Sequence, residues 1–386
     1  MDAKITVAVI GMGFGSEFVP LYMHHPDVAR VVICDTNAEA LDEAGSRFGV
    51  TDRRTSLEAV LKDGAINTVH LATPIPLHAE QSRVALDAGK HCACAVPMAL
   101  SQSGIEAVIA AQLRLGKVYM MMETAVRTRE FLWVQERIEQ GELGRIQFLK
   151  AAHYQAMESW GRHPGPALPK YWLGLPPMFY ATHAIAPLLA LAGTRAKRVH
   201  CFGSGQMLPQ LREQYGNPYP VETAIFQLEG TDVAAEVTKS IFQTARAVTE
   251  SFNVYGDRAS FEWQQLESES PVIFRMDGQN NEEIQHTPST GLRYTPVTAE
   301  RLDVPDRADL LPAEIARFTQ KTELDRAGHR GSHPHLVHEF VRAIVEGRKP
   351  AVDVITAANW TIAGLCAHNS AMRGGEGVNI PQFGSD

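Results

Sequence analysis

Short apolar runs alternate with amphipathic stretches over the first third of the chain. The apolar runs are rich in strand-favouring residues and lie at 4–11, 29–35, 66–73, 90–96 and 117–124. Helical patterns fill the intervals 37–49 and 76–89, the second of which ends in a glycine that suits a helix C-terminus. Another helix is predicted to open at Ser103, because Ser103 and Glu106 have capping-box spacing. Strand–helix alternation implies parallel strands with crossover helices, so residues 1–122 are predicted to form a domain with a doubly wound parallel sheet.

The pattern changes after about residue 145. Strand-like runs joined by hairpin-type turns lie at 145–155, 222–230, 233–243, 251–258 and 259–263. Residues 264–325 are polar and interrupted by prolines, which predicts a long excursion over the surface. Apolar residues at helical spacing over 333–347 predict the last large helix. Residues 123–386 are therefore predicted to form an α+β domain with a large, mostly antiparallel sheet and a C-terminal helix packed back toward the first domain.

Composition narrows the class of protein. The 386 residues carry a formal net charge of −8, whereas nucleic-acid binding depends on Lys and Arg that neutralise phosphates. No apolar stretch approaches the roughly 18 residues of a membrane span, and the N-terminus has no signal-peptide pattern. The five cysteines suit reduced thiols, and Cys92 and Cys94 lack a partner pair with zinc-ligand spacing. We therefore expect a cytoplasmic protein that binds no nucleic acid, membrane or metal.

A glycine-rich turn follows the first predicted strand. Gly11, Gly13 and Ser16 give the pattern Gly-x-Gly-x-x-Ser, and Gly15 lies one place before the usual third glycine. Such a turn lets backbone N–H groups approach a pyrophosphate. Asp35 ends the next predicted strand, where a carboxylate would bind an adenosine ribose 2′-hydroxyl and repel a 2′-phosphate. The sequence therefore predicts NAD rather than NADP as the cofactor.

Four further motifs follow the turn along the chain. They are ATPIPLHAE at 72–80, AGKHCACAVPMALS at 88–101, GELGRIQFLKA at 141–151 and EFVRAIVEGRKPAVDVITA at 339–357. In this order they resemble the glucose–fructose oxidoreductase, inositol dehydrogenase and MocA family over nearly the whole chain. The resemblance implies an NAD-binding Rossmann domain over residues 1–122 and a second domain that covers the nicotinamide. It also implies a homo-oligomer, dimer or tetramer, formed through the open face of the second sheet. The cofactor contacts it implies are Gly11, Gly13, Phe14, Gly15, Ser16, Asp35, Thr36, Thr73, Pro74, His78, Ala95, Val96, Pro97 and Glu123.

Two departures from the dehydrogenases of this family concern proton transfer. Those enzymes carry Glu-Lys-Pro where this chain has Ala95, Val96 and Pro97, and an Asp where it has Phe179. Only His183 remains of their three proton-handling residues. A plain hydroxyl-to-ketone dehydrogenase would therefore have lost its base.

The departures resemble another branch, the NAD-dependent glycosidases of the α-N-acetylgalactosaminidase type. Those carry Glu-Val-Pro, a strand ending like Met-Met-Leu-Glu-Asn, a segment like Tyr-Ala-Thr-His-Gly-Met-Gly-Pro and a Gly-His-Gly-Gly element. The matching segments here are AVP at 95–97, MMMET at 120–124, YATHAIAP at 180–187 and GHRG at 328–331. The resemblance implies that NAD stays bound while hydride leaves C3 of the sugar, the C2 proton is removed, the C1 group is eliminated, water adds and the hydride returns.

The resemblance implies roles for particular residues. His183 and Tyr180 are expected at the C3 hydroxyl, and a histidine with an ordinary pKa near ~6.5 suits proton transfer at neutral pH. His153 stands where the resembling glycosidases place a tyrosine as the C2 base. Neighbouring residues of a strand face opposite sides, so either His153 or Tyr154 faces the sugar, and position favours His153. Glu123 is expected to bind the nicotinamide ribose or to orient the substrate.

The segment 159–177 is rich in Pro and Gly and carries aromatic and basic side chains. Aromatic rings offer a platform for sugars, and Arg or Lys could hold an anionic group. We hypothesise an anionic hexoside such as a sulfoquinovoside, since NAD-dependent sulfoquinovosidases belong to the wider family. The residues predicted to contact it are Arg127, Tyr154, Arg162, Lys170, Tyr171, Trp172, His329 and His333. Two alternatives stay open: a sugar or cyclitol dehydrogenase that uses His183 and Tyr180, and a non-catalytic protein that senses sugar or NAD.

Overall fold

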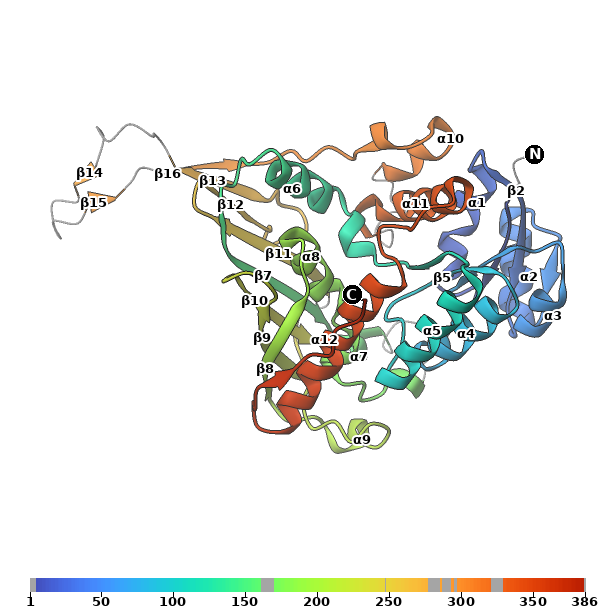
Figure 1. The fold of residues 1–386 in the computed structure, drawn as a ribbon, viewed down its shortest axis with the longest axis horizontal. Coiled ribbons are helices and arrows are strands. Elements are labelled where there is room, and N and C mark those ends of the chain that lie inside the picture. Colours follow the sequence, from blue (N-terminus) through green and yellow to red (C-terminus); the bar gives the residue numbers. More distant parts are fainter. Residues whose placement is uncertain are drawn as a thin grey trace.

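The structure is a computed structural model in which two sheets are joined by a layer of helices (Figure 1). It describes residues 5–160, 170–246, 248–276, 285–286, 293–294, 297–320 and 329–384. Within these ranges no helix is both long enough and apolar enough to cross a bilayer.

A six-stranded sheet in the order β3-β2-β1-β4-β5-β6 forms the N-terminal part. All its pairs are parallel, which confirms the predicted Rossmann-like sheet. Its strands are β1 (Ile5–Ile10), β2 (Val28–Cys34), β3 (Arg53–Arg54), β4 (Thr68–Leu71), β5 (His91–Cys94) and β6 (Tyr119–Met121). Its helices are η1 (Gly15–Glu17), α1 (Val19–His24), α2 (Ala38–Phe48), α3 (Leu57–Lys62), η2 (Ile75–Leu77), α4 (His78–Asp87) and α5 (Gln102–Leu115).

Helix α5 begins earlier than the capping-box pattern indicated. Ser101 is its N-cap, and the Ser101 hydroxyl accepts a hydrogen bond from the Gly104 backbone N–H at 3.1 Å. The prediction that Ser103 opens this helix is therefore wrong, because the earlier serine already satisfies a free N–H of the first turn.

A nine-stranded sheet in the order β16-β13-β12-β11-β7-β10-β9-β8-β17 forms the C-terminal part. Only β7 and β10 pair in parallel within it, so the predicted mostly antiparallel sheet is confirmed. Its strands are β7 (Ile146–Gln155), β8 (Ala196–Ser204), β9 (Val221–Leu228), β10 (Ala234–Ser240), β11 (Val248–Gly256), β12 (Ala259–Glu262), β13 (Val272–Met276), β16 (Val297–Arg301) and β17 (Val378–Asn379). Two short strands, β14 (Gln285–His286) and β15 (Arg293–Tyr294), pair with each other. Because β13 and β16 extend the large sheet, the surface excursion predicted for 264–325 is wrong at these strands.

Helices cover one face of the large sheet. Helix α8 packs on β7, β10 and β11, while α12 packs on β8 and also reaches α5 of the Rossmann part (Figure 1). The helices of this part are η3 (Thr124–Arg127), α6 (Arg129–Glu139), α7 (Met157–Trp160), η4 (Lys170–Trp172), η5 (Pro177–Tyr180), α8 (Thr182–Ala192), α9 (Pro209–Arg212), η6 (Ala308–Leu310), α10 (Ala313–Ala316), η7 (Arg317–Thr319), η9 (His329–Gly331), α11 (Ser332–Glu346) and α12 (Val354–Met372). Helix α11 is therefore not the last large helix. Helix α12 is buried on almost every side, so it lacks the amphipathic period that reveals a surface helix.

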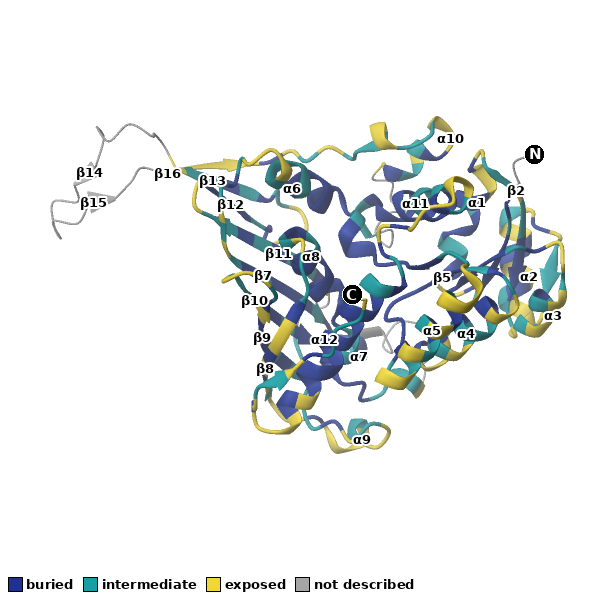
Figure 2. Ribbon diagram, in the orientation of Figure 1, coloured by how far each residue is buried: buried dark blue, intermediate teal, exposed yellow. Residues whose placement is uncertain are grey.

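Burial is concentrated in the helical layer and along the strands that face it (Figure 2). Along β9, Ala224 and Phe226 are buried, whereas Ile225 between them is 42% exposed. Phe202 of β8 is 60% exposed. The sheet therefore has one covered face and one face that carries exposed apolar side chains.

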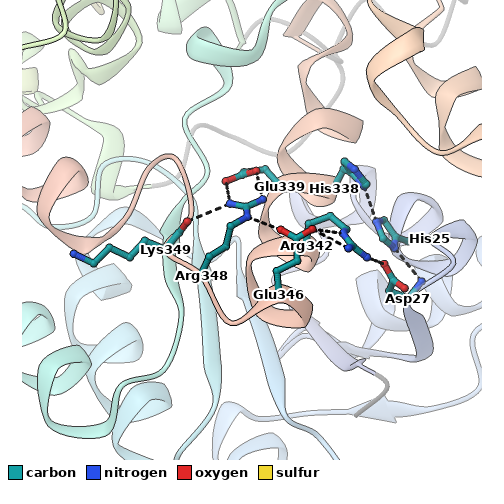
Figure 3. A network of polar contacts seen from close by, with 8 residues as sticks. All are labelled: His25, Asp27, His338, Glu339, Arg342, Glu346, Arg348 and Lys349. Atoms are coloured by element: carbon teal, nitrogen blue, oxygen red, sulfur yellow. Dashed lines mark hydrogen bonds and ion pairs between the residues drawn. The ribbon is translucent and has the colours of Figure 1, made fainter. Parts of the chain in front are cut away.

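Helix α11 joins the C-terminal part to the Rossmann part through polar contacts (Figure 3). Arg342 donates to Asp27 at 2.9 Å, and the ring nitrogens of His338 and His25 lie 3.0 Å apart. Because His25 and Asp27 follow α1, this network fixes α11 against the first domain. The short helix η9 directly precedes α11.

Candidate active site

The glycine-rich turn lies between β1 and η1. Gly11 has a φ of +93°, and a Cβ there would lie 2.4 Å from a neighbouring carbonyl oxygen, so the turn requires glycine. A Cβ at Gly13 would have no atom within 4 Å, so the backbone there is open to a ligand. Asp35 accepts a hydrogen bond from the Met12 backbone N–H at 2.6 Å, which holds its carboxylate beside the turn. This geometry fits a dinucleotide whose ribose contacts Asp35. Of the neighbouring predicted contacts, Phe14 lies in the same turn, Gly15 and Ser16 begin η1, and Thr36 directly follows Asp35.

Two further loops follow the carboxyl ends of β4 and β5, where open α/β sheets bind ligands. They contain Thr73, Pro74, Ala95, Val96 and Pro97. His78 joins them, since its ring nitrogens lie 2.7 Å from the Pro97 carbonyl oxygen and 2.9 Å from that of Thr73. Burial lowers the pKa of His78, but neighbouring Cys94 and the two carbonyl oxygens raise it to about 9. His78 is 1% exposed, so it supports the loops from behind.

Glu123, His183 and Tyr180 form a hydrogen-bonded chain. Glu123 Oε1 lies 2.5 Å from His183 Nδ1, and the Tyr180 hydroxyl lies 3.2 Å from His183 Nε2. Glu123 caps η3, where the same oxygen accepts from the Ala125 backbone N–H at 3.0 Å. Its other oxygen, Oε2, is buried and has no hydrogen-bond partner among the residues that the structure describes. That oxygen can accept a hydrogen bond from a hydroxyl group of a bound ligand.

The charges along this chain set the direction of proton transfer. Burial lowers the pKa of His183, but the negative charges of Glu123 and Glu250 outweigh burial and raise it above the ordinary 6.5. Burial raises the pKa of Tyr180, so the tyrosine keeps its proton at neutral pH. When Nδ1–H donates to Glu123, Nε2 can accept the Tyr180 proton. The chain can therefore draw a proton from a group bound at the tyrosine oxygen.

His153 faces this chain from the sheet. Its ring centroid lies 5.2 Å from that of His183 and 6.0 Å from that of Tyr180. In the strand ladder, His153 of β7 stands directly between Lys239 of β10 and Glu250 of β11. Glu250 Oε1 lies 3.5 Å from His153 Nε2. A row of three ionisable groups therefore runs across the sheet beneath the hydrogen-bonded chain.

Burial governs the protonation of this row. His153 is fully buried, and its Nδ1 has no hydrogen-bond partner within the described part of the chain. Burial and the charge of Lys239 lower the pKa of His153 well below its ordinary value, so the ring is neutral and can accept a proton. Burial likewise lowers the pKa of Lys239 well below 10.5. Lys239 Nζ donates to Gln155 at 2.8 Å and lies 5.3 Å from the centroid of the Tyr180 ring.

His329 and His333 connect the cluster to the glycine-rich turn. His329 Nδ1 lies 3.4 Å from Glu250 Oε2, and its ring centroid is 5.7 Å from that of His183 and 6.0 Å from that of Phe14. The His333 ring is 5.6 Å from that of Phe14. Burial raises the pKa of Glu250, but His183 and His329 lower it well below 4.5, so Glu250 carries a negative charge inside the cluster.

An aromatic wall adjoins the cluster. The ring of Trp172 meets that of Tyr180 edge-on at 4.8 Å, and Tyr171 lies 5.8 Å from Trp172. Lys170 precedes them in η4 and is exposed. Arg162, predicted to act with these residues, lies outside the described residues.

Two predicted substrate contacts lie apart from the cluster. Tyr154 follows His153 in β7 and therefore points to the opposite face of the sheet. Arg127, at the end of η3, lines a different cavity.

The sequence prediction missed Lys239, Glu250 and Thr124, whose hydroxyl lies 3.3 Å from His183 Nδ1. Lys239 shares a strand face with buried Ala235 and Val237. A charged residue in such an inward-facing series is the signal that could have identified it.

Comparisons with known proteins agree with this architecture. A family model described as an oxidoreductase family, NAD-binding Rossmann fold, matches residues 5–123. A second, described as the C-terminal alpha/beta domain of the same oxidoreductase family, matches residues 135–378. The predicted NAD-binding domain is thus confirmed.

Individual relatives are more distant. The chain is 32% identical over 139 residues to a levoglucosan dehydrogenase from Pseudarthrobacter phenanthrenivorans, a match that covers 36% of this chain and 35% of the relative. It is 22% identical to a glycosyl hydrolase family 109 protein from Saccharopolyspora erythraea over 98% of this chain and 83% of that protein.

A solved structure of levoglucosan dehydrogenase, in complex with NADH and levoglucosan, superposes with a TM-score of 0.76 at 21% identity. It covers 98% of this chain and 100% of the solved chain, so it shares the fold. With both of its parts matched by the family's models, the chain belongs to the glucose–fructose oxidoreductase, inositol dehydrogenase and MocA family.

Proposed function

We propose that this protein is an NAD-dependent glycoside hydrolase that works by transient oxidation at C3 of a hexoside. One observation carries the proposal: His153 faces the Glu123–His183–Tyr180 chain within one buried cluster. A hydroxyl oxidation needs one proton-transfer group, whereas oxidation followed by removal of the C2 proton needs two. Val96 at the position of the dehydrogenase lysine accords with this change of chemistry.

NAD, when bound, would take the C3 hydride and later return it. We assign its binding to the glycine-rich turn, to Asp35 and to the loops after β4 and β5. The Tyr180 oxygen would accept the C3 hydroxyl proton as its own proton passes to His183 Nε2. Glu123 would hold Nδ1 and stabilise the imidazolium that results, and the same groups would return the proton when the C3 ketone is reduced.

His153 would remove the C2 proton, which the C3 ketone makes acidic. The electrons of the C2–H bond then form a C1–C2 double bond as the C1–O bond to the aglycone breaks. Water adds at C1 and gives up one proton, which balances the proton taken by the departing aglycone oxygen, and protonated His153 returns a proton to C2. Glu250 would stabilise the cationic ring between these two steps, since its carboxylate lies 3.5 Å from Nε2.

We propose an anionic hexoside as the substrate. Trp172 and Tyr171 would support the sugar ring, and Lys170 and Arg162 would attract the anionic group. We leave Arg127 out of this site, because it lines a separate cavity. Comparing turnover of a sulfoquinovoside with that of the parent glucoside tests the substrate class, and faster cleavage of the neutral sugar would overturn it.

We also propose a homo-oligomer, dimer or tetramer, that uses the uncovered sheet face. Phe202 and Ile225, which are 60% and 42% exposed, would be buried at such a contact. A protein that sediments as a monomer would contradict this proposal.

Hydrolysis of aryl glycosides in deuterium oxide tests the hydrolase. We expect aglycone release, deuterium at C2 of the free sugar and no net NADH. Stoichiometric NADH without aglycone release would overturn the hydrolase. Neither product, with NAD bound, would instead indicate a sensing protein.

A sugar or cyclitol dehydrogenase is the second candidate. The Glu123–His183–Tyr180 chain could by itself accept a hydroxyl proton. The likeness to levoglucosan dehydrogenase favours this candidate, which the NADH measurement above distinguishes.

A further inference from the structure

A cavity of about 530 Å³ lies between η3, α6, the end of α8 and α12. Apolar side chains, among them Phe131, Leu189 and Trp360, form much of its wall. None of the proposed catalytic residues lines it. It is therefore distinct from the candidate active site.

Arg127 brings to this wall a positive charge that forms no ion pair among the described residues. Its Nε is buried and has no hydrogen-bond partner among the described residues, and none of their carboxylates lies within ion-pair distance of it. The acidic residues around it are already engaged: Glu339 holds Arg348 at 2.7 Å and Glu229 holds Arg195 at 2.5 Å. Burial and the charge of Arg348 lower the pKa of Arg127, whereas the charge of Glu339 raises it. The net lowering shows that burial of this cation is only partly offset.

We propose that this cavity binds a small organic carboxylate, with its carboxylate on the Arg127 guanidinium and its apolar body against Phe131, Leu189 and Trp360. The planar fork of an arginine matches a carboxylate through two parallel hydrogen bonds. An apolar body then gains by leaving water for the cavity wall.

The cavity shares two elements with the active site. Glu123 caps one end of η3, and Arg127 is the last residue of that four-residue helix. His183 lies in the first turn of α8, and Leu189 lies toward the other end of the same helix. An anion bound to Arg127 therefore contacts the short helix η3 that orients the Glu123 carboxylate. Because Glu123 contacts His183 Nδ1, occupation of the cavity changes the proton affinity of His183.

Crystals of the whole protein soaked in p-bromobenzoate test the site, because the anomalous signal of bromine reports its position. We expect a bromine peak in the cavity. In solution, Arg127→Met should bind benzoate at least about tenfold more weakly than the wild type. Arg127→Lys keeps the charge, loses the fork and should bind with intermediate affinity. Arg137→Met is the matched control, since Arg137 is also partly buried but pairs with Glu142 at 3.3 Å outside the cavity, and it should bind normally.

Unchanged NAD binding by each variant shows that the fold is intact. A bromine peak elsewhere, no bound bromobenzoate, or equal benzoate affinity in Arg127→Met would overturn the site. Nuclear magnetic resonance titration of His183 with and without benzoate tests the link to the active site. A shift in the wild type that is absent in Arg127→Met is expected, and an unshifted titration with the cavity occupied would overturn that link.

Discussion

Glu123→Gln removes one charge from the centre of the candidate site with little change in shape. Glu123 Oε1 lies 2.5 Å from His183 Nδ1, and its negative charge is one of those that raise the pKa of His183 despite burial. The glutamine amide can still accept a hydrogen bond from Nδ1. The substitution therefore tests the charge of residue 123 rather than its volume.

The magnitude follows from the separation of the charges. Unit charges about 4 Å apart at an effective dielectric constant of about 20 interact by about 4 kcal/mol, or about three pKa units. Glu250 keeps part of this stabilisation, so we expect the pKa of His183 to fall by about one to three units. The sign is fixed: the protonated imidazole loses its counter-charge, and its pKa drops below the wild-type value.

Single-turnover reduction of bound NAD, followed across pH, measures the effect. Because Nε2 must be unprotonated to accept the Tyr180 proton, the midpoint of the pH profile should move to lower pH in Glu123→Gln. The maximal rate should fall by about 10²- to 10⁴-fold, since the imidazolium formed in the reaction is no longer stabilised.

Glu222→Gln is the matched control. Glu222 is also buried and pairs with a histidine, His368, at 2.7 Å, yet it takes no part in the proposed proton transfer. Its substitution should leave the His183 midpoint in place. A midpoint that stays constant or rises in Glu123→Gln would refute the role of Glu123.

The remaining predictions concern the sheet and the domain contact. His153→Ala should abolish C2 exchange in deuterium oxide while NAD is still reduced, and unchanged exchange would exclude His153 as the base. Burial lowers the pKa of His153 most, and the positive charge of Lys239 lowers it further, so Lys239→Met should raise the midpoint of the pH profile of C2 exchange. Lys150→Met on β7 is the control, because this lysine is partly exposed and pairs with a glutamate at 3.1 Å, and it should leave that midpoint unchanged. Burial and His338 lower the pKa of His25 from 6.5 to about 4, so stability present above pH 6.5 is lost as the pH falls toward 4. The loss should be about 3 kcal/mol from this group, seen as weaker resistance to urea at pH 4.5 than at pH 7, and His25→Asn should flatten that dependence.

Local sequence patterns were sufficient for the Rossmann part and for part of the site. Alternation of strands and helices predicted the parallel sheet, and the motif around Tyr180 and His183 placed two members of the hydrogen-bonded chain. Strands β13 and β16 were missed because they lie in a segment that is polar over most of its length. The edge strand β16 is exposed throughout and is held by pairing with β13, whereas the apolar residues Val272–Phe274 of β13 were a local strand signal that went unused. Helix α12 was missed because a helix buried on almost every side has no amphipathic period.

The row of ionisable groups beneath the hydrogen-bonded Glu123–His183–Tyr180 chain could not be predicted either, but for a different reason. Lys239 and Glu250 lie 86 and 97 positions beyond His153, and only the register of β10 and β11 against β7 brings them to its sides. No local sequence pattern predicts that β7 pairs in parallel with β10 on one edge and antiparallel with β11 on the other. Ionisable residues at inward-facing strand positions are recognisable in sequence, but their partners are not.

The departures from the dehydrogenase pattern acquire a physical meaning in this arrangement. Phe179, at the position of the dehydrogenase Asp, packs against His368 with ring centroids 5.0 Å apart, so that position has become part of the packing around η5. Val96 is 7% exposed and brings no charge to the loop after β5. The sheet instead supplies Lys239 and Glu250, which flank His153 in the strand ladder, and the His153 ring lies 5.2 Å from that of His183. One departure, at Val96, thus lies in the Rossmann part and the other, at Phe179, lies in η5, while ionisable groups are present on the large sheet, as expected if a second proton, at C2, has to be removed from the sugar.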